Sequence, residues 1–402
     1  MSLNLSHLAA QIDDMAESLK VEEKNWSACL DQALDTIQHQ SLDPESLRRK
    51  IKDSRTTWLI AGITGQLDGR FTCPPCPPDF AVIATDGSHI GVDRHSPARC
   101  YLINIGSVML RYGQQPDAVL HSQPTLYSNK EDLIIVDPRG SSELPIEGGL
   151  LGAKRAVAEC LALAELGEEL APELPSTALV DGTLIMWGLA GHAYPEYVRT
   201  ELLRNGFLQA LDRIRDLGRR TGLALASYIS LPRSTEVANT LRIALCPYDP
   251  PDCDRHCPRK SSSVERECDT VSGIRDRDIF HAILEPGDRS ATFVSGSSIV
   301  QDYYADHEIR FFYLKVDNEI ARVEFPCWVE DMGNLDLLHA MILDQCRRGH
   351  GYPVALSEAH EQAVLSGPDR EQFRHLLELT LNEHRLPTGT SEKNRSKRTR
   401  WV

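Results

Sequence analysis

With 402 residues, 41% of them hydrophobic and 25% charged, the chain can bury a large core and has the composition of an ordinary globular protein. The formal net charge of −15 counts against non-specific binding to nucleic acid, although it does not fix the charge of one local groove. The first twenty residues lack the basic start and apolar run of a secretory signal, and no apolar stretch approaches the roughly 18–20 residues of a membrane span. We therefore expect a cytoplasmic protein whose 11 cysteines are not a disulfide scaffold.

The N-terminal region, residues 1–65, is predicted to be a helical arm. Its first 60 residues contain no glycine, and apolar side chains recur at spacings of three and four. These apolar positions are Leu5, Leu8, Ile12, Met15 and Leu19. Such an arm would pack on the main domain or on a second subunit, and a proline-dense connector follows at 66–79.

The next part of the chain is predicted to be a ribonuclease H-like core, an α/β fold with a mixed sheet. Three strand-like runs come first without a helix long enough for a crossover between them, so an antiparallel meander is expected. A helix, a strand, a second helix and a last strand then follow. In chain order the segments are 80–85, 100–105, 118–127, 149–170, 177–185, 196–219 and 223–229. In such a core the first and fourth strands lie side by side.

The C-terminal part is expected to complete one domain over 80–385, with C-terminal helices. It holds a cysteine-rich insertion at 246–268 and a hairpin that turns at Asp317-Asn318. The hairpin strands and the helices after it are expected at 308–316, 319–328, 336–348, 353–366 and 369–384. Residues 386–402 are predicted to form a basic, flexible tail.

Two aspartates precede glycines after apolar strands, as Asp86-Gly87-Ser88 and Asp181-Gly182-Thr183. A glycine lets the backbone bend while the carboxylate projects from the strand end. Mg²⁺ and Mn²⁺ prefer a few carboxylate oxygens, and paired ions can support phosphodiester cleavage. Alone, each Asp-Gly pair is also consistent with an ordinary turn. The topology would make Asp86 and Asp181 neighbours in space.

A third carboxylate is expected from the helix between these two strands. Glu159 is the first choice and Glu165 the second, although either is also consistent with a solvated helix face.

A sharper motif lies near the C-terminus, Gly351-Tyr352-Pro353-x-x-Leu-x-x-Ala-His360. Proline suits the first turn of a helix. His360 lies seven residues after Pro353, about two turns along the helix, and so returns to a similar face. A tyrosine and a histidine there can contact phosphate or move protons, or can be packed structural residues.

Together these motifs resemble the NurA nuclease family, and the segment Ala321-Arg322-Val323-Glu324-Phe325-Pro326 is similar to another family element. The resemblance implies a ribonuclease H-like nuclease over about 80–366. It implies that Asp86, Glu159 and Asp181 bind Mn²⁺ or Mg²⁺, and that Tyr352 and His360 orient or protonate the phosphate.

The resemblance also implies an oligomeric state, a partner protein and a cellular role. NurA proteins are homodimers that degrade DNA ends with HerA, a hexameric ATPase that translocates DNA. We therefore expect a cytoplasmic, nucleoid-associated enzyme of 5′-to-3′ end resection in double-strand break repair, acting on single strands and duplex ends. Two alternatives remain open: a catalytically silent scaffold for the ATPase, or an actin-like ATPase or phosphotransferase.

Further candidate residues lie outside the acidic motifs. Cys246, Cys253, Cys257 and Cys268 can close a structural Zn²⁺ site or hold an iron–sulfur cluster, or they are unliganded thiols. Cationic residues expected to hold DNA are Arg347, Arg348 and Arg322.

Overall fold

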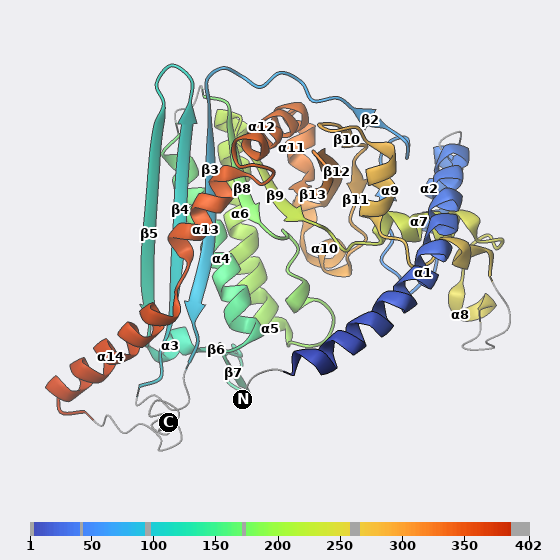
Figure 1. Ribbon diagram of the computed structural model, residues 1–402. Helices are drawn as coiled ribbons and strands as arrows, with labels where there is room; N and C mark the ends of the chain where they lie inside the picture. Colours follow the sequence, from blue (N-terminus) through green and yellow to red (C-terminus); the bar gives the residue numbers. More distant parts are fainter. Residues whose placement is uncertain (1–3, 41–42, 93–97, 171–173, 258–265, 387–402) are drawn as a thin grey trace. The chain divides into compact units, whose positions relative to one another are not determined.

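The computed structural model describes residues 4–40, 43–92, 98–170, 174–257, 266–386 (Figure 1). The basic tail predicted at 386–402 lies almost entirely outside these described residues. The chain divides into two compact units. Unit 1 contains Met1–Cys73, Ile229–Ser297 and Ile309–Val323, and unit 2 contains Pro74–Tyr228, Ser298–Glu308 and Glu324–Val402. This division differs from the expected arm followed by one domain over 80–385, because two internal segments group with the N-terminal helices.

Unit 1 begins with the two helices α1 (Leu5–Gln40) and α2 (Pro44–Lys52). Asp43 caps α2 by accepting a hydrogen bond from the backbone of Ser46 at 3.1 Å. The prediction of helix as far as residue 65 is wrong, because the chain leaves the helical conformation after Lys52 and then forms the short strand β1 (Gly62–Ile63).

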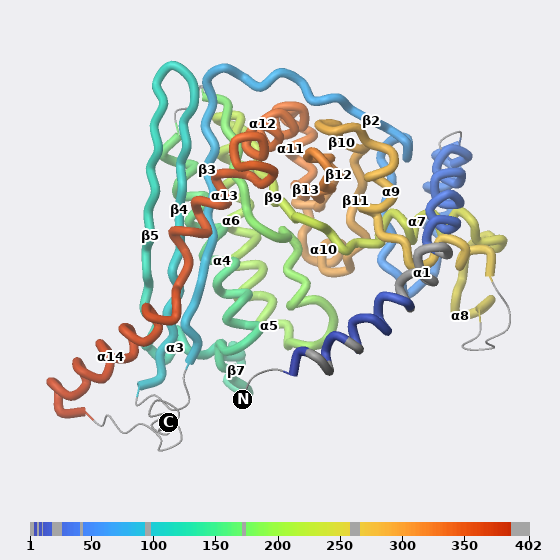
Figure 2. Tube along the Cα trace, in the orientation of Figure 1, coloured from blue at the N-terminus to red at the C-terminus, as the bar shows by residue number. Residues whose placement is uncertain are grey.

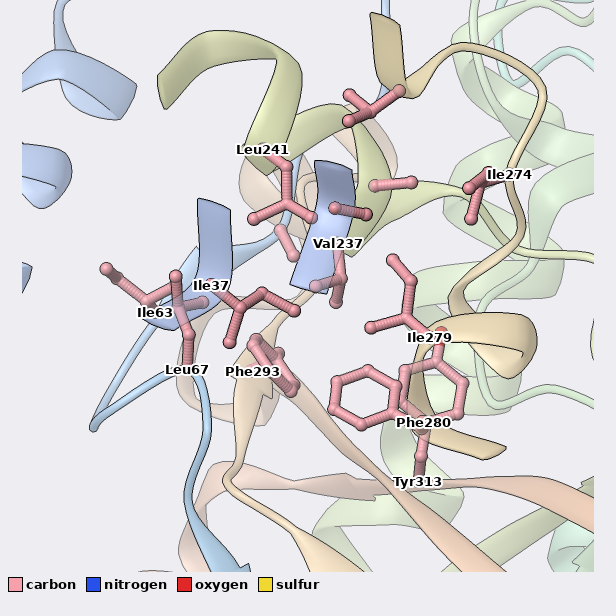
Figure 3. Close-up of a cluster of buried hydrophobic side chains, with 14 of the residues drawn as sticks. Ile37, Ile63, Leu67, Val237, Leu241, Ile274, Ile279, Phe280, Phe293 and Tyr313 are labelled. Atoms are coloured by element: carbon pink, nitrogen blue, oxygen red, sulfur yellow. The ribbon is translucent and has the colours of Figure 1, made fainter. Parts of the chain in front are cut away.

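The internal segments of unit 1 supply the partners that the N-terminal helices need. Ile37 of α1 is buried against Val237 and Leu241, and Phe280 stacks on Tyr313 in the same core (Figure 3). The other elements of unit 1 are β2 (Arg70–Phe71), α7 (Glu236–Leu245), α8 (Cys253–His256), η3 (Glu267–Val271), α9 (Asp276–Ile283), β10 (Arg289–Ser290), β11 (Phe293–Val294), β12 (Ile309–Val316) and the first part of β13 (Glu319–Pro326). β12 and β13 are neighbours joined by a turn at Asp317, which has φ 49°, so the predicted hairpin is confirmed.

The sheet of unit 2 confirms the predicted ribonuclease H-like core. Strands β3 (Phe80–Ile90), β4 (Tyr101–Tyr112) and β5 (Asp117–Tyr127) form the antiparallel meander. Strand β8 (Ser176–Asp181) then pairs in parallel with β3, and β9 (Ala224–Ser230) pairs in parallel with β8. The strand order β9-β8-β3-β4-β5 places the first and fourth core strands side by side, as expected.

Helices cover this sheet, and two of them position the site. α4 (Gly149–Glu168) contacts β3, and α13 (Val354–Ala363) packs on β3 and β4 (Figure 2). The predicted helix after β8 is present, but its middle is a π-helix, which divides it into α5 (Glu196–Arg199), η2 (Thr200–Leu208) and α6 (Gln209–Thr221). The other elements of unit 2 are α3 (Lys130–Leu133), β6 (Ile134–Val136), β7 (Glu143–Pro145), η1 (Trp187–Leu189), α10 (Ser298–Tyr303), η4 (Ala305–His307), α11 (Cys327–Asp331), α12 (Leu335–Arg348) and α14 (Gly367–Glu383). Among the described residues, none of the helices has the length and apolar character that crossing a bilayer requires.

Candidate active site

The two aspartates of the Asp-Gly motifs come together on neighbouring strands. Thr85 of β3 is in register with Val180 of β8 in the parallel pair, so Asp86 and Asp181 are the next residues on each strand. Asp181 is the last residue of β8 and is exposed, and Gly182 follows with φ +87°, as expected for a strand end. The expectation that Asp86 also ends its strand is wrong, because β3 continues to Ile90.

Gly87 has a different role from the predicted bend. A Cβ added at Gly87 would lie 2.5 Å from Glu159 Oε1 and 2.9 Å from Arg155 Cγ, so only glycine lets α4 approach β3 here. Thr85 fixes the same contact by donating its hydroxyl to the Glu159 carbonyl at 2.9 Å. The glycine after Asp86 therefore brings a helix carboxylate to the aspartates.

Glu159 is the helix acid that reaches this position. Its side chain is only 7% exposed, and burial raises its pKa from 4.5 to about 8. Arg155 counteracts this rise in pKa, while the charges of Asp86 and Asp181 add to it. The second choice, Glu165, is exposed. Six residues turn an α-helix by about 600°, which places Glu165 on a different face from Glu159.

Tyr352 and His360 of the C-terminal motif each contact one of the two aspartates. The Tyr352 hydroxyl donates to Asp181 Oδ1 at 2.9 Å, and His360 Nδ1 lies 2.8 Å from Asp86 Oδ2. Tyr352 also packs edge-on against Tyr228, with ring centroids 5.5 Å apart. Burial and the neighbouring Asp181 raise the tyrosine pKa, so its hydroxyl stays a hydrogen-bond donor. His360 is 60% exposed and lies on the solvent side of the site.

Close packing of α13 on the sheet sets the position of His360. Gly106 of β4 is paired with Asp86, and a Cβ added there would lie 2.2 Å from the Ala359 carbonyl oxygen. The Ala363 carbonyl accepts from Asn104 at 2.9 Å and also from the Ser88 hydroxyl. Pro353 is the N-cap of α13 and not a residue of its first turn, one position from where the sequence predicts it.

Two residues that the sequence analysis gave no role in the site, Arg155 and Glu324, support it. Arg155 Nε lies 3.1 Å from Glu159 Oε1. Glu324, 1% exposed, accepts hydrogen bonds from the Thr183 hydroxyl and the Leu184 backbone, at 2.7 and 3.0 Å, and so holds the turn after Asp181. The i,i+4 spacing of Arg155 and Glu159 was a usable signal, whereas only the folded chain connects Glu324 with β8.

The three arginines proposed to hold DNA have different environments. Arg322 belongs to unit 1 and is 3% exposed, with an ion pair of 2.8 Å to Glu236 and its guanidinium 3.6 Å from the Phe311 ring centroid. The prediction that Arg322 binds DNA is wrong, because a buried cation in an ion pair cannot contact a DNA phosphate. Arg348 is half-exposed, but Asp344 neutralises it. Arg347 is exposed, and its role in DNA binding stays a prediction.

The acidic residues suit a hard divalent cation by their chemistry. They are three carboxylates, which is the donor type that Mg²⁺ and Mn²⁺ prefer. Glu159 Oε1 is buried and lacks a hydrogen-bond partner, since the nearby Arg155 Nε is not oriented for such a bond. Across the described ranges, no group of three or more His, Cys, Asp or Glu side chains stands ready to hold an ion. Asp86 and Asp181 instead contact His360 and Tyr352, and ligation would replace these contacts.

The four cysteines of the insertion belong to unit 1, and all are free thiols. Cys253 and Cys257 stand at the two ends of α8, and the backbone N–H of Cys257 donates to the Cys253 carbonyl at 3.0 Å. Burial raises the pKa of Cys253, and the other three thiols raise it further. The part of the chain that the structure describes contains no metal-binding arrangement of them. A structural metal there stays a prediction.

The fold and the site define a ribonuclease H-like protein with a carboxylate-rich centre. Comparison with known families gives the assignment: residues 80–365 match the NurA domain, and the chain belongs to this family of nucleases. No curated protein matches the sequence. Among solved structures, the chain is similar to LC9-RNase H1, described as a type 1 RNase H with the type 2 active-site motif. That similarity has 12% identity and a TM-score of 0.22, and it covers 38% of this chain and 64% of the other.

Proposed function

We propose that this chain is a deoxyribonuclease that uses Mn²⁺ or Mg²⁺, with Asp86, Glu159 and Asp181 as metal ligands. The observation that carries the proposal is the placement of Asp86 and Asp181 at adjacent positions of paired strands, with buried Glu159 of α4 packed on Gly87 beside them. Bound ions would activate the attacking water and stabilise the leaving oxygen of a phosphodiester.

The residues around the acids have separate roles in this proposal. Tyr352 presents a hydroxyl that keeps its proton and can donate to a phosphate oxygen. His360, exposed at the mouth of the site, can give or take a proton at a bridging oxygen of the DNA backbone. Arg155 supplies a positive charge beside Glu159 and favours the carboxylate form that ligation needs.

Cleavage in the presence and absence of metal tests the proposal. We expect the purified chain to degrade labelled single-stranded DNA with Mn²⁺ and to be inactive in EDTA. Asp86→Asn and Glu159→Gln should each lower the rate at least about 100-fold, because each removes charge from the centre. Glu165→Gln is the matched control on the exposed face of α4 and should cleave like wild type. A wild-type chain that cuts no DNA with any divalent metal would refute the proposal.

The proposed biological setting is DNA end resection with 5′-to-3′ polarity, as a homodimer beside a HerA-type ATPase. Family membership supports this setting. A net charge of −15 also suits an enzyme that receives DNA from a motor instead of capturing it from solution. Stimulation of cleavage by the ATPase with ATP on duplex ends is the expected result, and equal rates with and without the motor would count against it.

Two other functions are alternatives to this proposal. A silent scaffold for the ATPase would bind the motor and leave DNA intact. The contacts of Tyr352 with Asp181 and of His360 with Asp86 count against this alternative. An actin-like ATPase would give Tyr352 and His360 no role. Retention of the motor without cleavage would support the first alternative, and tight ATP binding by this chain alone would support the second.

A further inference from the structure

A cavity of about 380 Å³ lies beside the candidate active site, and all its lining residues belong to unit 2. Arg155, Glu159 and Asp181 form part of its wall, so the cavity is continuous with the acidic centre. Its volume falls in the range of roughly 300–1,000 Å³ that is common for small-ligand sites. A second cavity, of about 770 Å³, contains none of the candidate catalytic residues.

One wall of the cavity is a face of α4 that carries only small side chains. Gly149, Gly152, Ala153 and Ala156 line it at spacings of three and four, which place them on one side of the helix. A Cβ added at Gly152 would meet no atom within 4 Å. The helix therefore leaves open space directly beside Arg155 and Glu159.

The opposite wall is the segment after β8, and internal hydrogen bonds make it rigid. Glu324 holds Thr183 and Leu184, as described above. The fully buried Tyr304 accepts from the Met186 backbone and donates to the Leu184 carbonyl, both at 2.9 Å. Trp187 follows at once and is 40% exposed at the cavity.

The charged groups of this wall are paired with each other, since Arg155 Nε lies 3.1 Å from Glu159 Oε1 and both residues line the cavity. Much of the remaining lining is apolar. Phe207, from the π-helical segment η2, adds an aromatic ring to the wall.

We propose that this cavity holds the nucleobase of the nucleotide next to the scissile phosphate. The inference rests on the proposed nuclease function and adds a binding site for one base of the DNA. An apolar space with an exposed tryptophan suits the flat face of any base, and stacking of this kind tolerates every sequence. A base enters such a space only when it is unpaired. The base beside the scissile phosphate is therefore unpaired when it occupies the cavity.

Abasic substitution tests this proposal directly. The substrates are single-stranded oligonucleotides of one sequence. Each contains a single abasic residue, which lies one position further along in each successive oligonucleotide. We expect wild-type cleavage to fall roughly 5- to 100-fold at the one phosphodiester whose neighbouring base is missing. Trp187→Ala should give the same loss on unmodified DNA, and the two changes together should lose no more than either alone. Trp187→Phe should restore most of the rate because it keeps an aromatic face.

A filling variant gives a second measurement. Ala156→Leu adds three carbons to the cavity wall and should slow cleavage on normal DNA more than on DNA with the abasic residue at the sensitive position. Ala158→Leu makes the same change on the same helix outside the cavity lining, and thermal unfolding of both variants shows whether each one folds.

The outcomes separate this inference from the proposed function. A wild-type chain without nuclease activity refutes the proposed function. The cavity inference is overturned, and the proposed function is kept, if the wild-type chain cuts DNA equally well wherever the abasic residue lies. Additive losses from Trp187→Ala and from the abasic residue would have the same meaning.

Discussion

Among single residues, Glu159 has the most pH-sensitive environment in the candidate active site. Its pKa is raised to about 8 in the folded chain, so the folded state binds a proton between pH 4.5 and about 8 that the unfolded state has released. The free energy of unfolding must therefore fall as pH rises through this window and level off above it.

Glu159→Gln tests this linkage because glutamine is neutral at every pH. In EDTA, the variant should lose the decline in stability and exceed wild type by a few kcal/mol (about 1.4 for each unit of pKa shift) at pH 8. Denaturant titrations between pH 5 and 9 measure the difference, with Glu165→Gln as the exposed control. Parallel stability curves for wild type and Glu159→Gln would show that the proton is not held.

Tyr352 offers a second test at the same scale. Tyr352→Phe removes the hydroxyl that donates to Asp181 but keeps the ring that packs on Tyr228. We expect kcat to fall roughly 100-fold with little change in melting temperature, since a phosphate donor is lost and the packing is kept. Tyr112→Phe removes a hydroxyl that accepts from Gln345 at 3.1 Å away from the acids, and it should keep full activity. Equal kinetics for the two variants would remove Tyr352 from the proposed chemistry.

At the scale of elements, Gly106 governs the contact between β4 and α13. Gly106→Ala would place its methyl group against the Ala359 carbonyl, so α13 must move and carry His360 away from Asp86. We expect a loss of about 1–3 kcal/mol in stability together with most of the nuclease activity. Gly65→Ala is the control, because its Cβ meets nothing within 4 Å. An active, fully stable Gly106→Ala would show that α13 does not position the histidine.

The cysteine-rich insertion gives a prediction that is independent of catalysis. If the four thiols close a structural site, the purified chain contains about one zinc or one iron–sulfur cluster, and Cys253→Ser with Cys257→Ser removes it. Cys327→Ser, at a cysteine of unit 2 that forms no disulfide, should leave the metal content unchanged. Mass spectrometry measures the zinc and iron content of the purified chain. A wild-type chain that is metal-free after growth in medium supplemented with both metals would refute the site.

The sequence predicted the elements whose pattern is local. The meander, α4, β8 and β9 follow from apolar runs and their spacing, and from these the adjacency of Asp86 and Asp181 follows by topology. The strand through Gly87 was not predictable, because Asp-Gly is a turn signal locally and only the approach of Glu159, 72 positions later, explains the extended backbone. Burial of Arg322 depends in the same way on Glu236, which lies far from it in sequence.

At the scale of the whole molecule, exposed apolar side chains on α1 indicate how copies of the chain associate. Ala33 and Ile37 are buried in unit 1, whereas Leu5, Ile12 and Met15 are 69%, 48% and 55% exposed. We expect a homodimer by light scattering, in which this apolar half of the helix meets a second copy. Ile12→Asp with Met15→Asp should then give monomers, and Glu17→Lys on the same helix should not. A wild type that is monomeric at all concentrations would contradict this prediction.

The pairing of Asp86 with His360 joins residues 274 positions apart. A ribosome that adds about 5–20 residues per second makes the three acids roughly 9 to 35 seconds before it reaches α13. Until then a growing chain has neither Tyr352 nor His360, and a chain broken off earlier never gains them. If Tyr352 and His360 have the roles proposed above, only chains that extend beyond residue 360 are able to cut DNA.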